Sequence, residues 1–182
     1  LVDSGAAEVV IAGGVESYSQ RPLRAMPDTA GGPAVPYDQA RFTPWPDRDP
    51  DMGAAAAALA ERLRIDRAAQ EAWAVDSHAK ARAVVAWPEI VPVAGVVRDA
   101  FTRDLTPRVA SRAPVLAGSI TAATAAVAAD AAAFVLVVSD RIAAGRGLRV
   151  LGGLTLGGDP TEPGLAPVAA IREALARAGM AP

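Results

Sequence analysis

The sequence predicts an α/β fold that is incomplete within this chain. Three short apolar runs predict strands, and they span Glu8–Ala12, Ala132–Val138 and Leu148–Leu156. The first two are continuous, which is typical of strands buried on both faces of a parallel or mixed sheet. Between the first two runs, apolar residues recur every three to four positions and predict amphipathic helices. Nothing in these strands and helices gives a closed sheet, so we expect part of a larger α/β architecture.

The composition excludes several classes of function. A net charge of −2 gives no basic surface for nucleic acid or an acidic membrane, and no run of 18 apolar residues spans a bilayer. The chain has no cysteine and one histidine, which excludes a disulfide scaffold, a thiolate nucleophile and the usual zinc sites within these residues. The first residues lack the features of a secretory signal, so a cytoplasmic location is expected.

The first 50 residues predict a strand followed by a long excursion. Leu1–Gly5 has the pattern of a last helical turn ending at glycine, and Gly13-Gly14 is expected to turn the chain sharply after the strand. The stretch from Gln20 to Pro50 is rich in proline. Because proline fixes φ and lacks a backbone N–H donor, this stretch is predicted to form an ordered loop rather than a helix or strand. Its aromatic side chains either line a ligand site or anchor the loop, and they are Tyr37, Phe42 and Trp45.

Two amphipathic helices are predicted after this excursion. Asp51-Met52-Gly53 opens an alanine-rich run of good helix formers that should end near Arg64. Asp66 is expected to cap a second helix reaching about Val85, and the two helices are expected to pack as a pair. His78 borders the second apolar stripe. We interpret it as a packed or surface residue, since no carboxylate that would make it a general base is identifiable.

The stretch between this helix and residue 112 predicts little regular structure. Trp87-Pro88 should end the second helix, and Glu89–Val97 is expected to form an edge strand that Pro92 interrupts. The following residues, Arg98–Arg112, are polar and broken. Within them, Arg103 is expected to pair with a neighbouring acid on the surface unless it binds a ligand.

The C-terminal part predicts one short and one long helix. Arg141–Gly147 suits a short helical turn. Pro167 stands where a proline is favoured at the start of a helix, and an apolar stripe continues from it to Gly179, a typical C-terminal cap.

Six motifs, in order and at consistent spacing, resemble landmarks of the thiolase family. They are Gly13-Gly14-Val15-Glu16-Ser17, Asp51-Met52-Gly53 with Ala60-Glu61-Arg62, Ser77-His78-Ala79-Lys80-Ala81, Glu89-Ile90-Val91-Pro92-Val93, Ser119–Asp140, and Asp159-Pro160 with Gly164–Ala170. The fifth resembles the family's TVTAGNASGxNDGAAAxLLMSE, and the sixth resembles its DP…GIGPVPA. The resemblance covers residues 1–182, which correspond to the middle of a family member.

The resemblance implies a five-layered α/β/α/β/α fold of two similar halves, with an inserted loop domain that covers coenzyme A (CoA). Residues 1–20 and 119–147 would belong to the first half, 21–118 to the loop domain and 148–182 to the start of the second half. The family's acyl-accepting cysteine is expected upstream of Leu1, and its second cysteine, GHP histidine and NEAF asparagine beyond Pro182. We therefore expect no catalytic residue in this chain, and no activity of the chain alone, because the thiolate and oxyanion hole are missing.

The resemblance also implies a set of contacts with CoA, at Met52, Arg103, Leu116, Ala122 and Ala126. Arg103 is the leading candidate, because a guanidinium suits a charge-assisted hydrogen bond to a CoA phosphate. The family's serine that contacts the pantetheine arm falls at Ala126. That replacement removes one neutral hydrogen bond, worth about 1 kcal/mol, which weakens CoA binding without abolishing it.

Other positions of Ser119–Asp140 also depart from the family's pattern. Its Gly-Asn pair falls at Ala123-Thr124, its second asparagine at Ala129 and its later glycine at Ala131. The aspartate remains, as Asp130.

Three functions stay open at this point. The first is a thiolase-like acyltransferase acting on acyl-CoA by Claisen condensation or by thiolysis of 3-ketoacyl-CoA, with CoA as substrate and no other cofactor. The second is a non-catalytic thiolase-like subunit that binds CoA or stabilises a catalytic partner. A nucleotide-binding Rossmann unit is disfavoured because G-x-G-x-x-G is absent.

The expected partners are acyl-CoA and further protein subunits. The family resemblance implies a homo-oligomer. We also expect the isolated chain to associate, since the strand at Glu8–Ala12 would expose an apolar edge and face.

Overall fold

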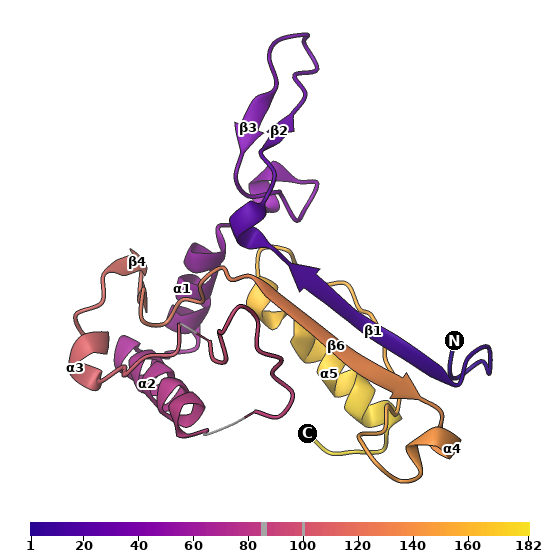
Figure 1. Cartoon of the computed structure of the whole chain (residues 1–182). Helices are drawn as coiled ribbons and strands as arrows, with labels where there is room; N and C mark the ends of the chain where they lie inside the picture. The colour runs from indigo at the N-terminus through magenta and orange to yellow at the C-terminus, as the bar shows by residue number, and fades with distance from the viewer. Residues whose placement is uncertain (85–86, 100) are drawn as a thin grey trace. The chain divides into compact units, whose positions relative to one another are not determined.

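A computed structural model describes residues 1–84, 87–99 and 101–182 of the chain (Figure 1). The chain divides into two compact units. The strand unit comprises Leu1–Phe42, Val127–Thr155 and Ala170–Pro182. The helix unit comprises Thr43–Ala126 and Leu156–Ala169.

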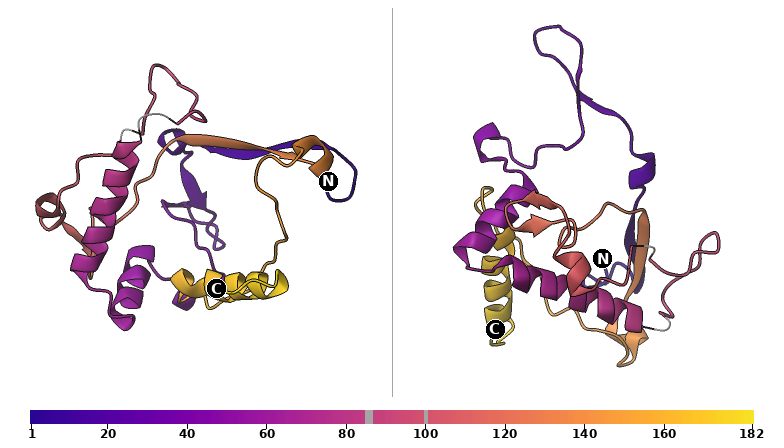
Figure 2. Two further views of the ribbon diagram at one scale, coloured as in Figure 1. Left: turned by 90° about the horizontal axis from the view of Figure 1, so that it is seen from below. Right: turned by 90° about the vertical axis from the view of Figure 1, so that its left-hand side faces the viewer.

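The strand unit is built on one long antiparallel ribbon. Strand β1 (Val9–Glu16) pairs with β6 (Ala131–Val138) along its whole length, from Val9 opposite Val138 to Glu16 opposite Ala131 (Figures 1 and 2). Both strands were predicted from their apolar runs, and both are confirmed. The expected burial on both faces is wrong: Ile11 is 73% exposed and Leu136 64%. Among the described residues no third strand joins this ribbon, and its apolar side chains lie in solvent.

The glycine pair Gly13-Gly14 lies inside β1 and does not end it. The predicted sharp turn is therefore wrong. Gly13 stands opposite Phe134, and a Cβ built on Gly13 would lie 2.8 Å from the Cα of Phe134 and closer still to the Ala133 carbonyl. This glycine is needed for the close approach of two strands.

The proline-rich excursion contains a small hairpin that was not predicted. Strand β2 (Arg24–Met26) pairs with β3 (Val35–Tyr37), flanked by the short 3-10 helices η1 (Tyr18–Gln20) and η2 (Pro46–Arg48). The Asp28 carboxylate accepts hydrogen bonds from the backbone N–H groups of Ala30 and Gly32, which closes the loop between the two strands.

The three aromatic residues of this excursion differ in burial. Tyr37 is half-buried, whereas Phe42 and Trp45 are 47% and 53% exposed. The Arg48 guanidinium lies 5.5 Å from the centre of the Trp45 ring. The two alternatives for these residues, ligand site or anchor, therefore stay predictions.

The helix unit contains both predicted helices with their predicted caps. Helix α1 spans Met52–Arg62, and the Asp51 carboxylate accepts a hydrogen bond from the backbone N–H of Ala54 at 2.8 Å. Helix α2 spans Arg67–Ala83, and Asp66 accepts from Ala69 at 2.7 Å. The predicted end at Val85 lies outside the described residues.

These two helices do not pack as the predicted pair. Helix α1 packs against η3 (Pro163–Leu165) and the hairpin of β4 (Val115–Ala117) and β5 (Ile120–Thr121), whereas α2 packs against α3 (Pro107–Ala110). Between α1 and α2, Arg64 takes a left-handed φ of 56°. The small core is formed by Leu105, Ala110 and Ala123, with Ala74 and Val75 of α2 against it.

Residues Leu156–Ala169 join the helix unit from far along the sequence. Arg48 and Asp159 form an ion pair of 3.1 Å across 111 residues, and Arg62 pairs with Glu162 across 100. Gly164 fits closely on α1, because a Cβ there would lie 2.7 Å from the Leu59 side chain. This segment therefore packs against α1 through the Arg62 ion pair and the Gly164 contact, and is joined to η2 through the Arg48 ion pair.

Two predicted strands are absent from the part of the chain that the structure describes. Glu89–Val97 forms turns with a single bridge between Val93 and Val96, and Leu148–Leu156 has no regular structure. Gly95 has a φ of 80° and Ala94 one of 49°, which bend the chain away from an extended strand. The polar stretch before residue 112 contains α3, which was not predicted and which Thr106 caps through the Val109 N–H.

The predicted terminal features are confirmed. Gly5, with a φ of 72°, ends the first turn. Helix α4 (Asp140–Ala143) and helix α5 (Ala166–Arg177) lie where short and long helices were expected. After α5, the N–H groups of Gly179 and Met180 bond back to the Ala176 and Leu175 carbonyls, the pattern of a glycine-terminated helix.

Candidate functional site

The five positions predicted to contact CoA all lie in the helix unit. Met52 is the first residue of α1, and Leu116 is the middle residue of β4. Helix α1 packs against β4, and a Cβ on Gly53 would lie 3.4 Å from that of Ala117. The structure thus brings the start of α1 beside the Leu116 strand, with both side chains substantially exposed, Met52 at 41% and Leu116 at 60%.

Ala122 and Ala126 flank a rigid turn that follows β5. Thr121 is fully buried, and its Oγ1 accepts a hydrogen bond from the Ala123 N–H. The Thr124 hydroxyl accepts from the Thr121 N–H and donates to the Thr121 carbonyl. Ala122 is half-buried and donates its N–H to the Pro114 carbonyl, whereas Ala126 is exposed. The turn is therefore held by its own threonines.

Arg103 lies apart from that turn, in a cluster with His78 and Phe101. The Arg103 backbone N–H donates to Nδ1 of His78 at 3.3 Å, and the His78 and Phe101 rings are 5.6 Å apart and tilted. The Arg103 guanidinium lies 4.8 Å from the centre of the Phe101 ring. The predicted surface pairing of Arg103 with an acid is wrong among the described residues, because Asp104 pairs with Arg82 instead, at 2.5 Å.

The His78 contact was missed from the sequence. His78 is half-buried, and its partner lies 25 residues away in a stretch without regular structure. No periodic signal joins two such positions.

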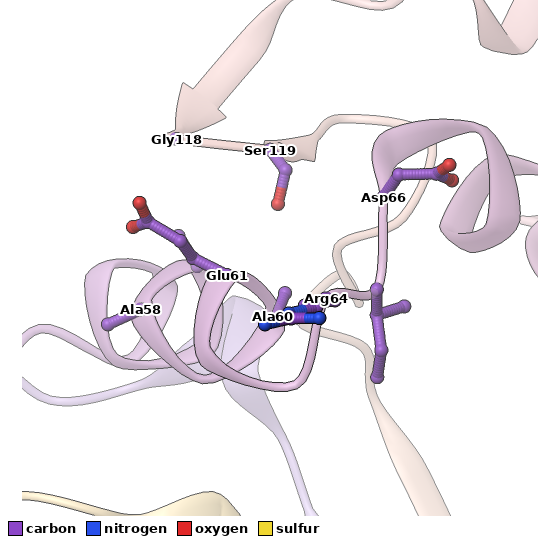
Figure 3. A pocket seen from close by; sticks show the side chains of 9 residues that line it. Ala58, Ala60, Glu61, Arg64, Asp66, Gly118 and Ser119 are labelled. Carbon is purple, nitrogen blue, oxygen red and sulfur yellow. The ribbon is translucent and has the colours of Figure 1, made fainter.

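A separate pocket of about 580 Å³ lies between α1, the turn after it and the β4–β5 turn (Figure 3). Its floor is formed by alanines of α1, and Glu61, Arg64 and Asp66 supply charges at its edge. The Ser119 hydroxyl points toward α1 and accepts a hydrogen bond from Nε2 of Gln70 at 2.9 Å. None of the five predicted contact residues lines this pocket.

The described residues contain neither a grouped set of metal ligands nor a membrane-spanning helix. No three His, Cys, Asp or Glu side chains among them are grouped so as to hold a metal ion. Within the same residues, no helix has the length and apolar character needed to cross a bilayer.

Comparison with known proteins identifies the family. Residues 1–141 match the family model described as thiolase, N-terminal domain. The chain belongs to the thiolase family. It is 34% identical over 189 residues to YhfS of Bacillus subtilis and 33% identical over 202 residues to the acetyl-CoA acetyltransferase of Pseudomonas aeruginosa. Both alignments cover 96% of the chain but 48% and 51% of the relatives, so this thiolase-family chain spans about half the length of the curated relatives it matches.

The structure resembles solved thiolases as well. The Acat5 thiolase from Ascaris suum, solved in complex with coenzyme A, superposes with a TM-score of 0.74 at 26% identity. The match covers 98% of this chain and 52% of that protein. The predicted fold, an incomplete thiolase-like α/β architecture, is confirmed.

The family's aspartate, which this thiolase-family chain retains as Asp130, makes a specific contact in the strand unit. Its carboxylate accepts hydrogen bonds from the Ser19 hydroxyl at 2.5 Å and from the Ser19 N–H at 2.8 Å. These bonds, with one from the Tyr18 backbone, hold the pKa of Asp130 below its ordinary value of 3.8. Asp130 therefore links the chain just before β6 to the turn just after β1.

Replacing Asp130 by asparagine is expected to loosen this link at neutral pH. A depressed pKa in the folded protein means that the ionised carboxylate contributes stability above pH 3.8, and that this contribution is lost as the pH falls through the lower folded value. Hydrogen exchange at the Ser19 amide should therefore be faster in D130N than in the natural chain at pH 7, and the two should converge once the pH falls below the lowered pKa of Asp130. D3N, which changes another carboxylate of the strand unit, is the control, and an equal effect of both substitutions would contradict the role of Asp130.

Proposed function

We propose that this chain is the CoA-binding part of a thiolase-like acyltransferase. The reaction of the whole protein is the Claisen condensation of acyl-CoA or the thiolysis of 3-ketoacyl-CoA. The observation that carries the proposal is the thiolase N-terminal match over residues 1–141, supported by structural likeness to a thiolase solved with coenzyme A.

Within this proposal, Met52, Leu116, Ala122, Ala126 and Arg103 contact CoA. Met52 and Leu116 offer exposed apolar surface at the contact of α1 with β4, suited to the pantetheine arm. Arg103 offers a guanidinium that forms no ion pair among the described residues, suited to a phosphate. Ala126 offers no hydrogen bond, so affinity at this position comes from shape alone.

The proposal assigns residues 21–118 to the loop domain, 1–20 and 119–147 to the first thiolase half, and 148–182 to the start of the second. Because the chain has no cysteine, the acyl-accepting thiolate has to come from polypeptide outside these 182 residues. We propose that catalysis therefore requires that polypeptide or a partner subunit, within a cytoplasmic oligomer.

Replacing Arg103 by alanine tests the phosphate contact. A hydrogen bond to a charged group contributes about 1.5 to 3 kcal/mol, and the exposure of Arg103 places its loss at the lower end, so CoA affinity should fall about tenfold. Isothermal calorimetry with CoA measures this. R108A removes an equal charge from α3, in the same unit, and should change affinity little.

One outcome would overturn the Arg103 contact, and another would overturn CoA binding as a whole. Equal affinities of R103A and R108A would remove Arg103 from the site. No heat from the natural chain at millimolar CoA would remove CoA binding altogether.

The second candidate is a non-catalytic thiolase-like subunit that binds CoA or stabilises a catalytic partner. The alanines in place of polar residues between Ala122 and Ala131 favour it. Assay of the longest product of this coding region for thiolysis of 3-ketoacyl-CoA separates the two: turnover supports the enzyme, and CoA binding without turnover supports the subunit.

A further inference from the structure

The backbone around Arg103 is held from both sides. Its N–H donates to Nδ1 of His78, and its carbonyl accepts from the Leu105 N–H at 2.9 Å. Leu105 is 4% exposed and belongs to the small core of the helix unit. One side of Arg103 is therefore fixed by the core, and the other by a single side chain of α2.

The same side chain of α2 also fixes the surface on which the guanidinium rests. The His78 ring contacts the Phe101 ring, and the Arg103 guanidinium lies over the Phe101 ring in a cation–π contact. His78 thus touches the arginine segment twice, at the Arg103 backbone and at the ring under its charge.

We propose that His78 is a positioning residue for the anion contact of Arg103. It does not touch the ligand. It keeps the 101–105 segment in the conformation that presents the guanidinium, which lowers the ordering cost of binding a phosphate. The proposal rests on the proposed function, because it takes Arg103 as a contact of CoA.

Two substitutions separate the two contacts of His78. H78F keeps a ring against Phe101 but removes the acceptor, whereas H78N keeps an oxygen at the position of Nδ1 but removes the ring. S77A, at the neighbouring exposed position of α2, is the control. Phenylalanine, asparagine and histidine have similar helix propensities, so α2 itself should be little affected.

The expected result is a loss of affinity that depends on the acceptor. H78F should weaken CoA binding about fivefold, the loss that one missing neutral hydrogen bond produces, while H78N should stay within about twofold and S77A unchanged. Exchange of the Arg103 amide hydrogen should be about fivefold faster in H78F and close to natural in H78N.

A double-mutant cycle distinguishes positioning from a general structural role. In an R103A background, H78F should have no further effect on CoA affinity, because the side chain it positions is gone. An H78F loss that persists in R103A, or an H78N loss as large as that of H78F, would overturn the proposal. If R103A itself leaves CoA affinity unchanged, the proposed phosphate contact fails, and the amide exchange at Arg103 still decides whether His78 holds the segment.

Discussion

The G13A variant is expected to lose the pairing of β1 with β6. The new methyl group would meet the Ala133 carbonyl and the backbone of Phe134, neither of which can move without shifting the strand. Overpacking of this kind costs about 1 to 3 kcal/mol, and a two-stranded ribbon has little stability in reserve. Amide hydrogens of both strands should lose protection, as measured by hydrogen exchange.

Gly14 supplies a matched control one residue away. A Cβ on Gly14 meets no atom within 4 Å, because successive side chains point to opposite faces of a strand. G14A should therefore keep the ribbon, or stabilise it slightly by restricting the unfolded chain. Equal loss of protection in both variants would show that general strand flexibility, and not the contact with Phe134, limits the ribbon.

The G118A variant should destabilise the helix unit by about 2 to 5 kcal/mol. Gly118 has a φ of 51°, where any other residue costs about 1 to 2 kcal/mol, and its added methyl would lie 2.8 Å from the Cβ of Ala57 in α1. The overpacking adds about 1 to 3 kcal/mol. Urea unfolding followed by helical circular dichroism measures the sum.

Gly95 separates the two contributions to that loss. It lies in the same unit with a φ of 80° and no atom near its Cβ position, so G95A carries only the backbone strain. The difference between the two variants then reports the contact of the β4–β5 turn with α1. If G118A and G95A lower the free energy of unfolding equally, the contact of the β4–β5 turn with α1 contributes nothing to stability.

Local features of this fold could be predicted from the sequence. Asp51 and Asp66 cap their helices through an N–H three residues on, and Gly179 ends α5, so each signal and its partner lie within one turn of chain. The family could be predicted too, because six motifs retain their order. The strands at Glu8–Ala12 and Ala132–Val138 followed from apolar runs of strand length.

Features that depend on distant partners could not be predicted. Gly13 and Gly14 look alike in sequence, and only the approach of Phe134 distinguishes them. The run Leu148–Leu156 has the apolar character of a strand but hydrogen-bonds to no strand among the described residues.

The candidate site shows the same limit. Arg103 was proposed from the family resemblance, whereas its contact with His78 depends on how α2 meets a stretch 25 residues away.

The packing of Leu156–Ala169 along α1 has a consequence for folding during synthesis. The helix unit takes most of its residues from Thr43–Ala126 but closes with ion pairs that Arg48 and Arg62 make to residues 111 and 100 positions later. On the ribosome, α1 is therefore synthesised long before the segment that covers it. Its alanine-rich face stays uncovered while the β6 strand is synthesised. Contacts of such high sequence separation slow folding. A chaperone that recognises exposed apolar helices would meet α1 in that interval.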